Sequence, residues 1–262
     1  KVSKKAKNGK IKIYVYQLCN NLGGFMVNSV FYKDLQPEQL LSKLNAFPVA
    51  YLPIGTLEWH GRHMPLGTDM LVPEAVFAKV AKNIGGIVLT PLFLAPDIQQ
   101  KIKQKKFAGM EICGFEKNKP HQLFGNCYHI SNGLFKKVIM AIAENLQRNG
   151  FKYLVAHGHG PSINIFSQYK KKILKKYGIT CFTLFDLGYE GKDGIQTDHA
   201  AANETSLVMA INQDLVDIEN LAKDKIPIAI WGKDPQKSAS VEYGKDVFNK
   251  NFSFLDKNIL GL

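Results

Sequence analysis

The chain has 262 residues, of which 45% are hydrophobic, and this length suits one large α/β domain with a full core. No apolar stretch reaches the roughly 18–20 residues that cross a bilayer. The short apolar run at residues 11–19 has no cleavage pattern behind it, so the sequence predicts neither a membrane span nor a signal peptide. The net charge is +12, yet the only arginines are Arg62 and Arg148. Because base-reading and phosphate-binding sites favour arginine, we expect a solvated lysine surface and no nucleic-acid partner.

The cysteines and the N-terminal segment bear on the compartment and on domain organisation. The four cysteines are far apart and form no CxxC pair, which favours free thiols in a reducing, cytoplasmic compartment, although a Cys113–Cys127 bridge stays open. Residues 1–25 are rich in lysine and have no partner in the strand and helix pattern that follows. We expect them to be a basic extension, non-native or disordered, in front of a single domain over residues 26–262 that opens at Met26.

Strand-like and helix-like patterns alternate along the rest of the chain. The apolar runs predict buried strands and the amphipathic or capped segments predict helices. In chain order we expect a strand at 50–54, a helix at 72–84, a strand at 86–94, a lysine-rich loop or flap at 99–119, a helix at 132–148, a strand at 153–156, a helix at 162–177, a strand at 179–187 and a helix at 200–213. This alternation predicts an α/β fold with a mostly parallel sheet covered on both faces, in which chemistry gathers at the carboxyl ends of the strands.

The first polar cluster follows the strand at 50–54. Glu58, His60, His63 and Asp69 lie within twelve residues punctuated by glycine and proline, and Asp69 is placed to head a helix. Imidazole and carboxylate at this density indicate a transition-metal site, and one aspartate can bridge two metals. The plainer alternative is a solvated loop with a helix cap.

Two further clusters follow later strands. His157 and His159 come directly after the strand at 153–156, and glycines on both sides of His159 let the backbone approach a ligand closely. Asp198, His199 and Glu204 open the last helix, where a buried carboxylate is costly unless something pairs with it. A metal would do so, whereas the alternative for Glu204 is a capping role near the helix start.

These residues together resemble the motifs of the creatininase (creatinine amidohydrolase) family over about residues 28–250. The segment from Leu52 to Asp69 resembles the first signature of the family, and Gly158-His159-Gly160 resembles its second metal motif. The segment from His199 to Ser206 resembles its third motif, which ends in Glu-Thr-Ser, and the stretches at 234–235 and 239–244 are similar to its C-terminal motif.

The resemblance implies a three-layer α/β/α fold, a dinuclear metal centre and hydrolysis of a C–N bond in a small cyclic or linear amide. Zinc is the first candidate for the two divalent ions, with manganese or iron as alternatives. Homo-oligomers, hexamers among them, are also implied. Residue by residue, the expected metal ligands are Glu58, His60, Asp69, His159 and Glu204, the expected catalytic residues are His199 and Asp198, and the expected supporting or substrate-contacting residues are His63, His157 and His121.

The chain departs from the family pattern at two informative positions. Creatininase proper has a glutamate two residues after the second-motif histidine, where this chain has Pro161. The tryptophan associated with creatinine binding, four residues before the catalytic histidine, is Ile195 here. These changes argue against creatinine itself as the substrate.

The expected mechanism is attack of a metal-activated water on an amide carbonyl. Metal binding lowers the pKa of water toward about 7, and His199, oriented by Asp198, would give a proton to the leaving nitrogen. Two alternatives remain on the same fold: a formamide deformylase of nucleotide- or flavin-type metabolism, and a non-catalytic metal-binding relative for which Pro161 is the best support.

Overall fold

The computed structural model describes residues 29–114, 119–187, 194–223 and 228–261. The expected N-terminal extension at residues 1–25 and Cys19 lie outside the described residues. Cys113, Cys127 and Cys181 are free thiols, so the alternative of a Cys113–Cys127 bridge is wrong.

The centre of the fold is a four-stranded sheet in the order β2-β1-β5-β6. All three pairings are parallel, and Tyr51 of β1 stands between Val88 of β2 and Val155 of β5. The strands are β1 (Val49–Ile54), β2 (Ile87–Val88), β5 (Tyr153–Gly158) and β6 (Thr180–Thr183). Every residue of β1 is buried, as expected of a central strand covered on both faces.

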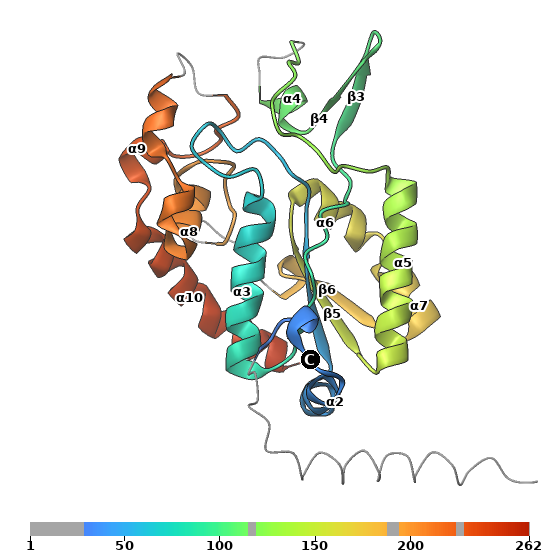
Figure 1. Cartoon of the computed structure of the whole chain (residues 1–262). Coiled ribbons are helices and arrows are strands. Elements are labelled where there is room, and N and C mark those ends of the chain that lie inside the picture. Colours follow the sequence, from blue (N-terminus) through green and yellow to red (C-terminus); the bar gives the residue numbers. More distant parts are fainter. Residues whose placement is uncertain (1–28, 115–118, 188–193, 224–227, 262) are drawn as a thin grey trace, which may run out of the picture.

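Helices cover both faces of this sheet (Figure 1). On one face, α3 (Thr68–Ile84), α8 (Ala202–Ile211) and α10 (Val241–Leu260) pack against Val49, Tyr51 and Val155. On the other face, α5 (Asn132–Asn149), α6 (Gly160–Ser167) and α7 (Lys170–Tyr177) pack against Ala50, Leu52 and Leu154. Because side chains alternate along a strand, β1 contributes side chains to the hydrophobic core on each face of the sheet. The expected three-layer α/β/α fold is confirmed.

The remaining elements are short or peripheral. They are η1 (Tyr32–Asp34), α2 (Pro37–Ala46), β3 (Gln99–Ile102), β4 (Lys105–Ala108), α4 (Met110–Cys113), η2 (Phe185–Leu187), η3 (Gln213–Leu215), η4 (Ile218–Lys223) and α9 (Pro235–Ser238). Among the described residues, no helix has the length and apolar character needed to cross a membrane.

The structure corrects the expected loop at 99–119. Residues 99–108 form the antiparallel hairpin β3–β4, in which Ile102 pairs with Lys105, and α4 follows it. The two residues of the turn are Lys103 and Gln104, so the Asn-Gly or Asp-Gly signal of tight hairpins is missing. The lysine-rich composition therefore concealed a strand pair that rises above the sheet edge in Figure 1.

Three other expected elements differ in extent. The strand expected at 86–94 is regular only at β2, because Pro91 lacks the N–H that would continue the ladder, although Leu92 still donates to the Pro53 carbonyl over 2.9 Å. The helix expected at 162–177 is two helices that break near Gln168. The strand expected at 179–187 ends at Thr183 and gives way to η2.

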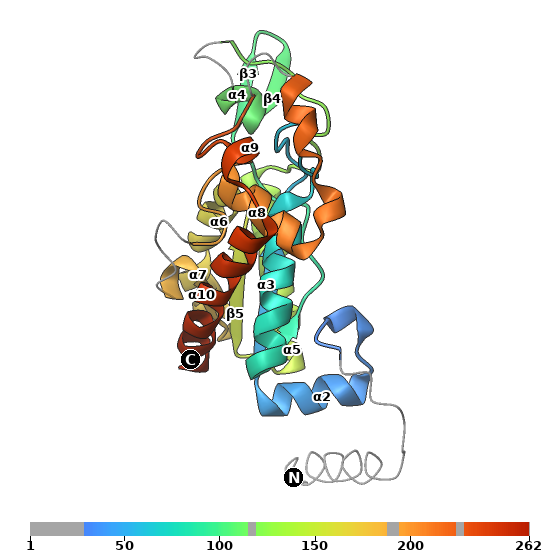
Figure 2. The same cartoon turned by 90° about the vertical axis from the view of Figure 1, so that its left-hand side faces the viewer.

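Besides the short helices α4 and α9, two longer helices of the described residues were not among the expected elements. The first is α2, in which only Leu44 is buried. The second is α10, a twenty-residue helix that lies beside α3 and α8 in Figure 2. Its buried residues include Gly244, Val247 and Phe248, spaced three and four positions apart as on one helix face, so the signal for α10 was present in the sequence.

Candidate metal centre

A cavity of about 390 Å³ opens at the carboxyl ends of β1 and β5. Its wall includes Glu58, Asp69, His159, His199 and Glu204, which come from three segments far apart in the sequence. This is the edge of a parallel sheet where strand ends and helix starts converge. The sequence-based expectation that the polar clusters meet there is confirmed by the cavity lining.

The first segment folds back on itself after β1. The backbone N–H of Glu58 donates to the carbonyl of Leu66 over 3.0 Å, which closes the loop between β1 and α3. Asp69 is the second residue of α3 and is buried, so its carboxylate lies at the positive end of the helix dipole. This closure brings the carboxylates of Glu58 and Asp69 to the same side of the sheet edge.

The second segment packs closely against the end of β1 at Gly158. This residue has φ +141°, and a Cβ there would collide with the Ile54 carbonyl oxygen, so only glycine fits. The next N–H, that of His159, donates to the same carbonyl over 2.9 Å. The His159 ring therefore emerges beside Asp69 from the neighbouring strand.

The third segment is organised by Asp198. Its carboxylate accepts the backbone N–H groups of Asn203 and Glu204 over 2.7 and 3.0 Å and so caps α8. Ala200 adopts φ +52° and donates its N–H to Glu204 Oε2 over 2.8 Å. These contacts fix the buried Glu204 carboxylate toward the cavity.

Asp69 stands between His60 and His159, the two histidines expected to bind metal. Its Oδ2 lies 2.9 Å from His159 Nδ1, and its Oδ1 lies 3.6 Å from His60 Nε2. Glu58 Oε2 lies 3.3 Å from His159 Nδ1, whereas Glu204 Oε2 lies 3.6 Å from His60 Nε2. One aspartate thus faces two separate imidazoles with its two oxygens, and each imidazole has a second carboxylate of its own.

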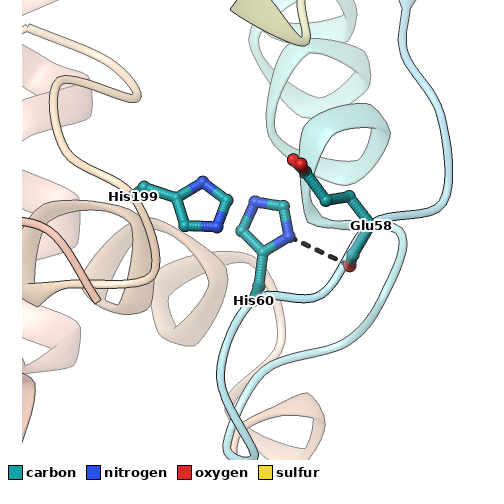
Figure 3. A group of neighbouring side chains, drawn as sticks. All are labelled: Glu58, His60 and His199. Atoms are coloured by element: carbon teal, nitrogen blue, oxygen red, sulfur yellow. Dashed lines mark hydrogen bonds between the residues drawn. The ribbon is translucent and has the colours of Figure 1, made fainter. Parts of the chain in front are cut away.

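Three groups of ligand atoms among the described residues are close enough to hold a metal ion. The atoms of each group all lie within 4.8 Å of one another, and the groups are Glu58, Asp69 and His159; His60, Asp69 and Glu204; and Glu58, His60 and His199. Figure 3 shows the third group, with the His60 ring held by the Glu58 carbonyl and lying next to the His199 ring at a centroid distance of 4.3 Å.

The buried carboxylates and histidines of the site shift one another's pKa values. Burial opposes protonation of His60, yet Asp69, Glu204 and Glu58 outweigh it and raise its pKa to about 10. Burial raises the pKa of Glu58 to about 7 and that of Glu204 to about 8. For Asp69, burial acts upward, but His60 and His159 together hold its pKa well below the usual range.

These residues fit divalent cations. Glu58 Oε1 and His60 Nε2 are buried without a hydrogen-bond partner, which is costly unless something else satisfies them. Carboxylate oxygens and imidazole nitrogens are ligands that zinc and manganese accept. The expected ligands Glu58, His60, Asp69, His159 and Glu204 are therefore brought together in one place.

His199 is held by a different partner than expected. Its Nε2 lies 3.0 Å from the Trp59 carbonyl oxygen, whereas the carboxylate of Asp198 is occupied by the helix cap. The expected orientation of His199 by Asp198 is thus replaced by a backbone carbonyl from the first segment. The N–H groups at the start of α8 need acceptors, and the Asp198 carboxylate supplies them.

The supporting histidines lie at different depths. His63 is buried and its Nε2 lies 2.9 Å from the Thr205 hydroxyl, so it holds α8 rather than a ligand carboxylate. His157 lines the cavity and meets Phe185 edge-on at 5.8 Å. His121 is exposed beside the Lys119 carbonyl and lies outside the described cavity wall, so its expected role stays a prediction.

Asp97, Gln196 and Trp231 are among the cavity residues that were not expected from the sequence. Asp97 Oδ1 lies 3.1 Å from His159 Nε2. Gln196 has φ +56° and donates to Asp69 Oδ1 and Glu204 Oε1 over 3.4 Å. Trp231 lies 5.8 Å from the His199 ring between centroids. No local motif marks these three, because each meets the site through contacts that depend on tertiary packing.

The fold and the site define an α/β protein with a candidate dinuclear metal centre at the edge of a parallel sheet. The family model of creatininase, described as creatinine amidohydrolase, matches residues 33–250. This chain belongs to the creatininase family.

Particular relatives agree with this assignment. Creatinine amidohydrolase of Pseudomonas putida is 27% identical over 216 residues, which cover 75% of this chain and 77% of the relative. A structure of manganese creatininase superposes with a TM-score of 0.66 at 23% identity, covering 88% of this chain and 98% of the other. A mutant creatininase of Zn-Zn type gives a TM-score of 0.66 at 22% identity, covering 88% and 97%.

Proposed function

We propose that this protein is a metal-dependent amidohydrolase that hydrolyses a C–N bond of a small cyclic or linear amide. The observation that carries the proposal is the position of Asp69, whose two carboxylate oxygens face His60 and His159 separately. Glu58 and His159 would hold one ion together with Asp69, and His60 and Glu204 would hold the other. The manganese and Zn-Zn forms of the related structures support these two metals as the first candidates.

The chemistry divides between the metals and the residues of this chain. Bound divalent ions lower the pKa of a coordinated water toward about 7 and so make hydroxide available at neutral pH. Because a carbonyl only accepts, the Trp59 carbonyl requires the proton of His199 to sit on Nε2, which leaves Nδ1 as the free base. Burial, with His60 adding to it, lowers the pKa of His199 to about 3. We infer that this neutral ring takes a proton from the attacking water at Nδ1 and passes it to the leaving nitrogen.

We propose that the substrate is not strictly creatinine. Ile195, which replaces the tryptophan of creatininase proper, is buried with an exposed fraction of 2%. Trp231 and Phe185 instead supply aromatic surface to the cavity wall, from segments far apart in the sequence. A changed aromatic wall around a retained ligand set favours the same reaction on a different small amide, and formamides are one such class.

The alternative of a non-catalytic relative rests on Pro161. Against it, the Glu204 carboxylate lies where a second ion would need an oxygen ligand, 3.6 Å from His60 Nε2. A Pro161→Glu variant distinguishes an active enzyme with two metal ions from a non-catalytic relative. We expect two bound metals before and after the change, with activity altered less than about threefold, or 0.7 kcal/mol. A rise from one metal to two would instead identify a degenerate site in the natural chain.

The test of the function is metal analysis followed by a substrate screen. Purified protein is loaded with zinc or manganese, the metal content is measured, and small amides, lactams, formamides and creatinine are offered with each metal. We expect two equivalents of metal and turnover of at least one class. Glu58→Gln and His159→Ala variants are expected to lose both, and full metal content with full hydrolysis in both variants would refute the assigned ligands.

We also propose a cytoplasmic homo-oligomer, with a hexamer as the assembly to look for. The free thiols at Cys113, Cys127 and Cys181 support a reducing compartment. Light scattering of the purified protein measures the mass directly, and a monomer of 29.3 kDa would refute the assembly.

A further inference from the structure

Asp97 is a buried carboxylate beside the metal centre that the ligand motifs do not include. It follows the strand-like stretch that pairs with β1 and directly precedes the hairpin β3–β4. Its side chain is 3% exposed and lines the cavity next to His159. A buried carboxylate needs partners, so its contacts indicate its role.

The contacts of Asp97 lead to the far nitrogen of His159. Oδ1 of Asp97 lies 3.1 Å from His159 Nε2 and also accepts the backbone N–H of Ile98 over 2.6 Å. The other ring nitrogen, Nδ1, faces Asp69 and Glu58. The two nitrogens of this imidazole therefore point at two different sets of carboxylates.

The hairpin keeps Asp97 in this place. Gly109, which ends the hairpin, donates its N–H to the Ile98 carbonyl over 2.9 Å. It has φ +53°, and a Cβ there would collide with both Glu58 Oε1 and Asp97 Oδ2. The backbone of the hairpin thus closes directly over the carboxylates of Glu58 and Asp97, which only glycine allows.

We propose that Asp97 is the positioning residue of the metal centre: it accepts the Nε2–H of His159, fixes the tautomer of the ring and so presents Nδ1 to the metal. A metal-ligating histidine commonly donates its second ring N–H to a carboxylate, which sets the ring orientation and raises its basicity as a ligand. This inference rests on the metal centre of the proposed function. It assigns to the segment before the hairpin a part in metal binding.

The experiment compares Asp97→Asn and Asp97→Ala with a matched control, Asp186→Asn. Asp186 also follows a strand of the sheet and bonds to Thr183 and Lys170, but it does not line the cavity. Zinc affinity is measured by competition with a chromophoric chelator, and the hydrogen bond of the His159 Nε2–H by its ¹H and ¹⁵N NMR shifts in the zinc-loaded protein. Circular dichroism checks the fold of each variant.

We expect Asp97→Ala to weaken binding of one zinc ion by about 10–100-fold and to shift the ¹H signal of the His159 Nε2–H upfield, because the hydrogen bond to the carboxylate is lost. The asparagine side chain keeps an oxygen that can accept the same N–H, so Asp97→Asn should lose less affinity than Asp97→Ala, and the control should lose none. If Asp97→Ala does not fold, Asp97→Asn carries the test. Unchanged zinc affinity and an unchanged Nε2–H signal of His159 in the folded variants would overturn the proposal for Asp97 alone. Natural protein without tightly bound zinc or manganese would overturn the proposed function as well.

Discussion

The floor and the rim of the cavity are built in different ways. We define the floor as Glu58, His60, Asp69, His159 and Glu204, and the rim as Asp97, the hairpin β3–β4, Phe185 and Trp231. The floor residues are at most 5% exposed and come from the loop after β1, the end of β5 and the starts of α3 and α8, whereas Phe185 and Trp231 are 48% and 47% exposed. Buried residues therefore make up the part of the site that resembles the family, and exposed aromatic residues make up part of the rim, so we expect reaction and specificity to vary separately.

The largest expected effect comes from the centre of the floor. Asp69→Asn removes a charge that two histidines share, so we expect loss of tightly bound metal and a fall in kcat/KM of about 10⁴-fold or more, equivalent to about 5 kcal/mol. Metal content and turnover on the substrate found in the screen measure this. An Asp186→Asn variant serves as the control, and retained metal in Asp69→Asn would show that Asp69 is not shared.

A variant of His199, which lies beside the floor, distinguishes proton transfer from metal binding. We expect His199→Gln to lower kcat by about 10³-fold, because general acid–base catalysis contributes about 10²–10⁴-fold, while both metals stay bound. Single-turnover rates and metal analysis are measured together. Loss of one metal in this variant would mean that His199 acts as a ligand, as its closeness to Glu58 and His60 also allows.

The burial of the histidines next to the floor predicts a pH-dependent stability of the metal-free protein. Burial lowers the pKa of His157 from 6.5 to about 4. The unfolded chain therefore takes up this proton first as the pH falls. The contribution of His157 is complete above pH 6.5 and is lost toward pH 4, and it amounts to at most about 3 kcal/mol.

Urea unfolding with a chelator at pH 7.5, 6 and 5 measures this contribution. The free energy of unfolding should fall less steeply with decreasing pH in His157→Gln than in the natural protein. Parallel curves for the two proteins would show that His157 is hydrated in the folded state.

The smallest effect is expected at the rim. Trp231 contributes an exposed aromatic face next to His199, so Trp231→Ala should raise KM about tenfold and change kcat less than threefold, as for lost uniform binding. Trp231→Phe is the matched control and should keep most of the affinity. A larger fall in kcat than in affinity would show that Trp231 acts on the chemical step, as the floor residues do, rather than on substrate binding.

Local sequence patterns were enough to predict the sheet, the layers and the floor. The apolar runs that became β1 and β5 mark buried strands, and parallel strands end at one edge, so the histidines and carboxylates that follow them had to meet. The clusters were also dense enough to resemble a known family, which supplied the ligand set. The helix α10 was readable from its buried spacing but was not among the expected elements.

The partners of these residues depended on the tertiary structure. Asp97 meets His159 across 62 residues, His63 meets Thr205 across 142, and His199 takes the Trp59 carbonyl rather than its neighbour Asp198. A residue type indicates what it can donate or accept, but which partner satisfies it depends on the packing of distant segments and on competition among acceptors. For this reason the chemistry of the floor could be read from local patterns, whereas its orientation, and the rim proposed to contact the substrate, required the folded chain.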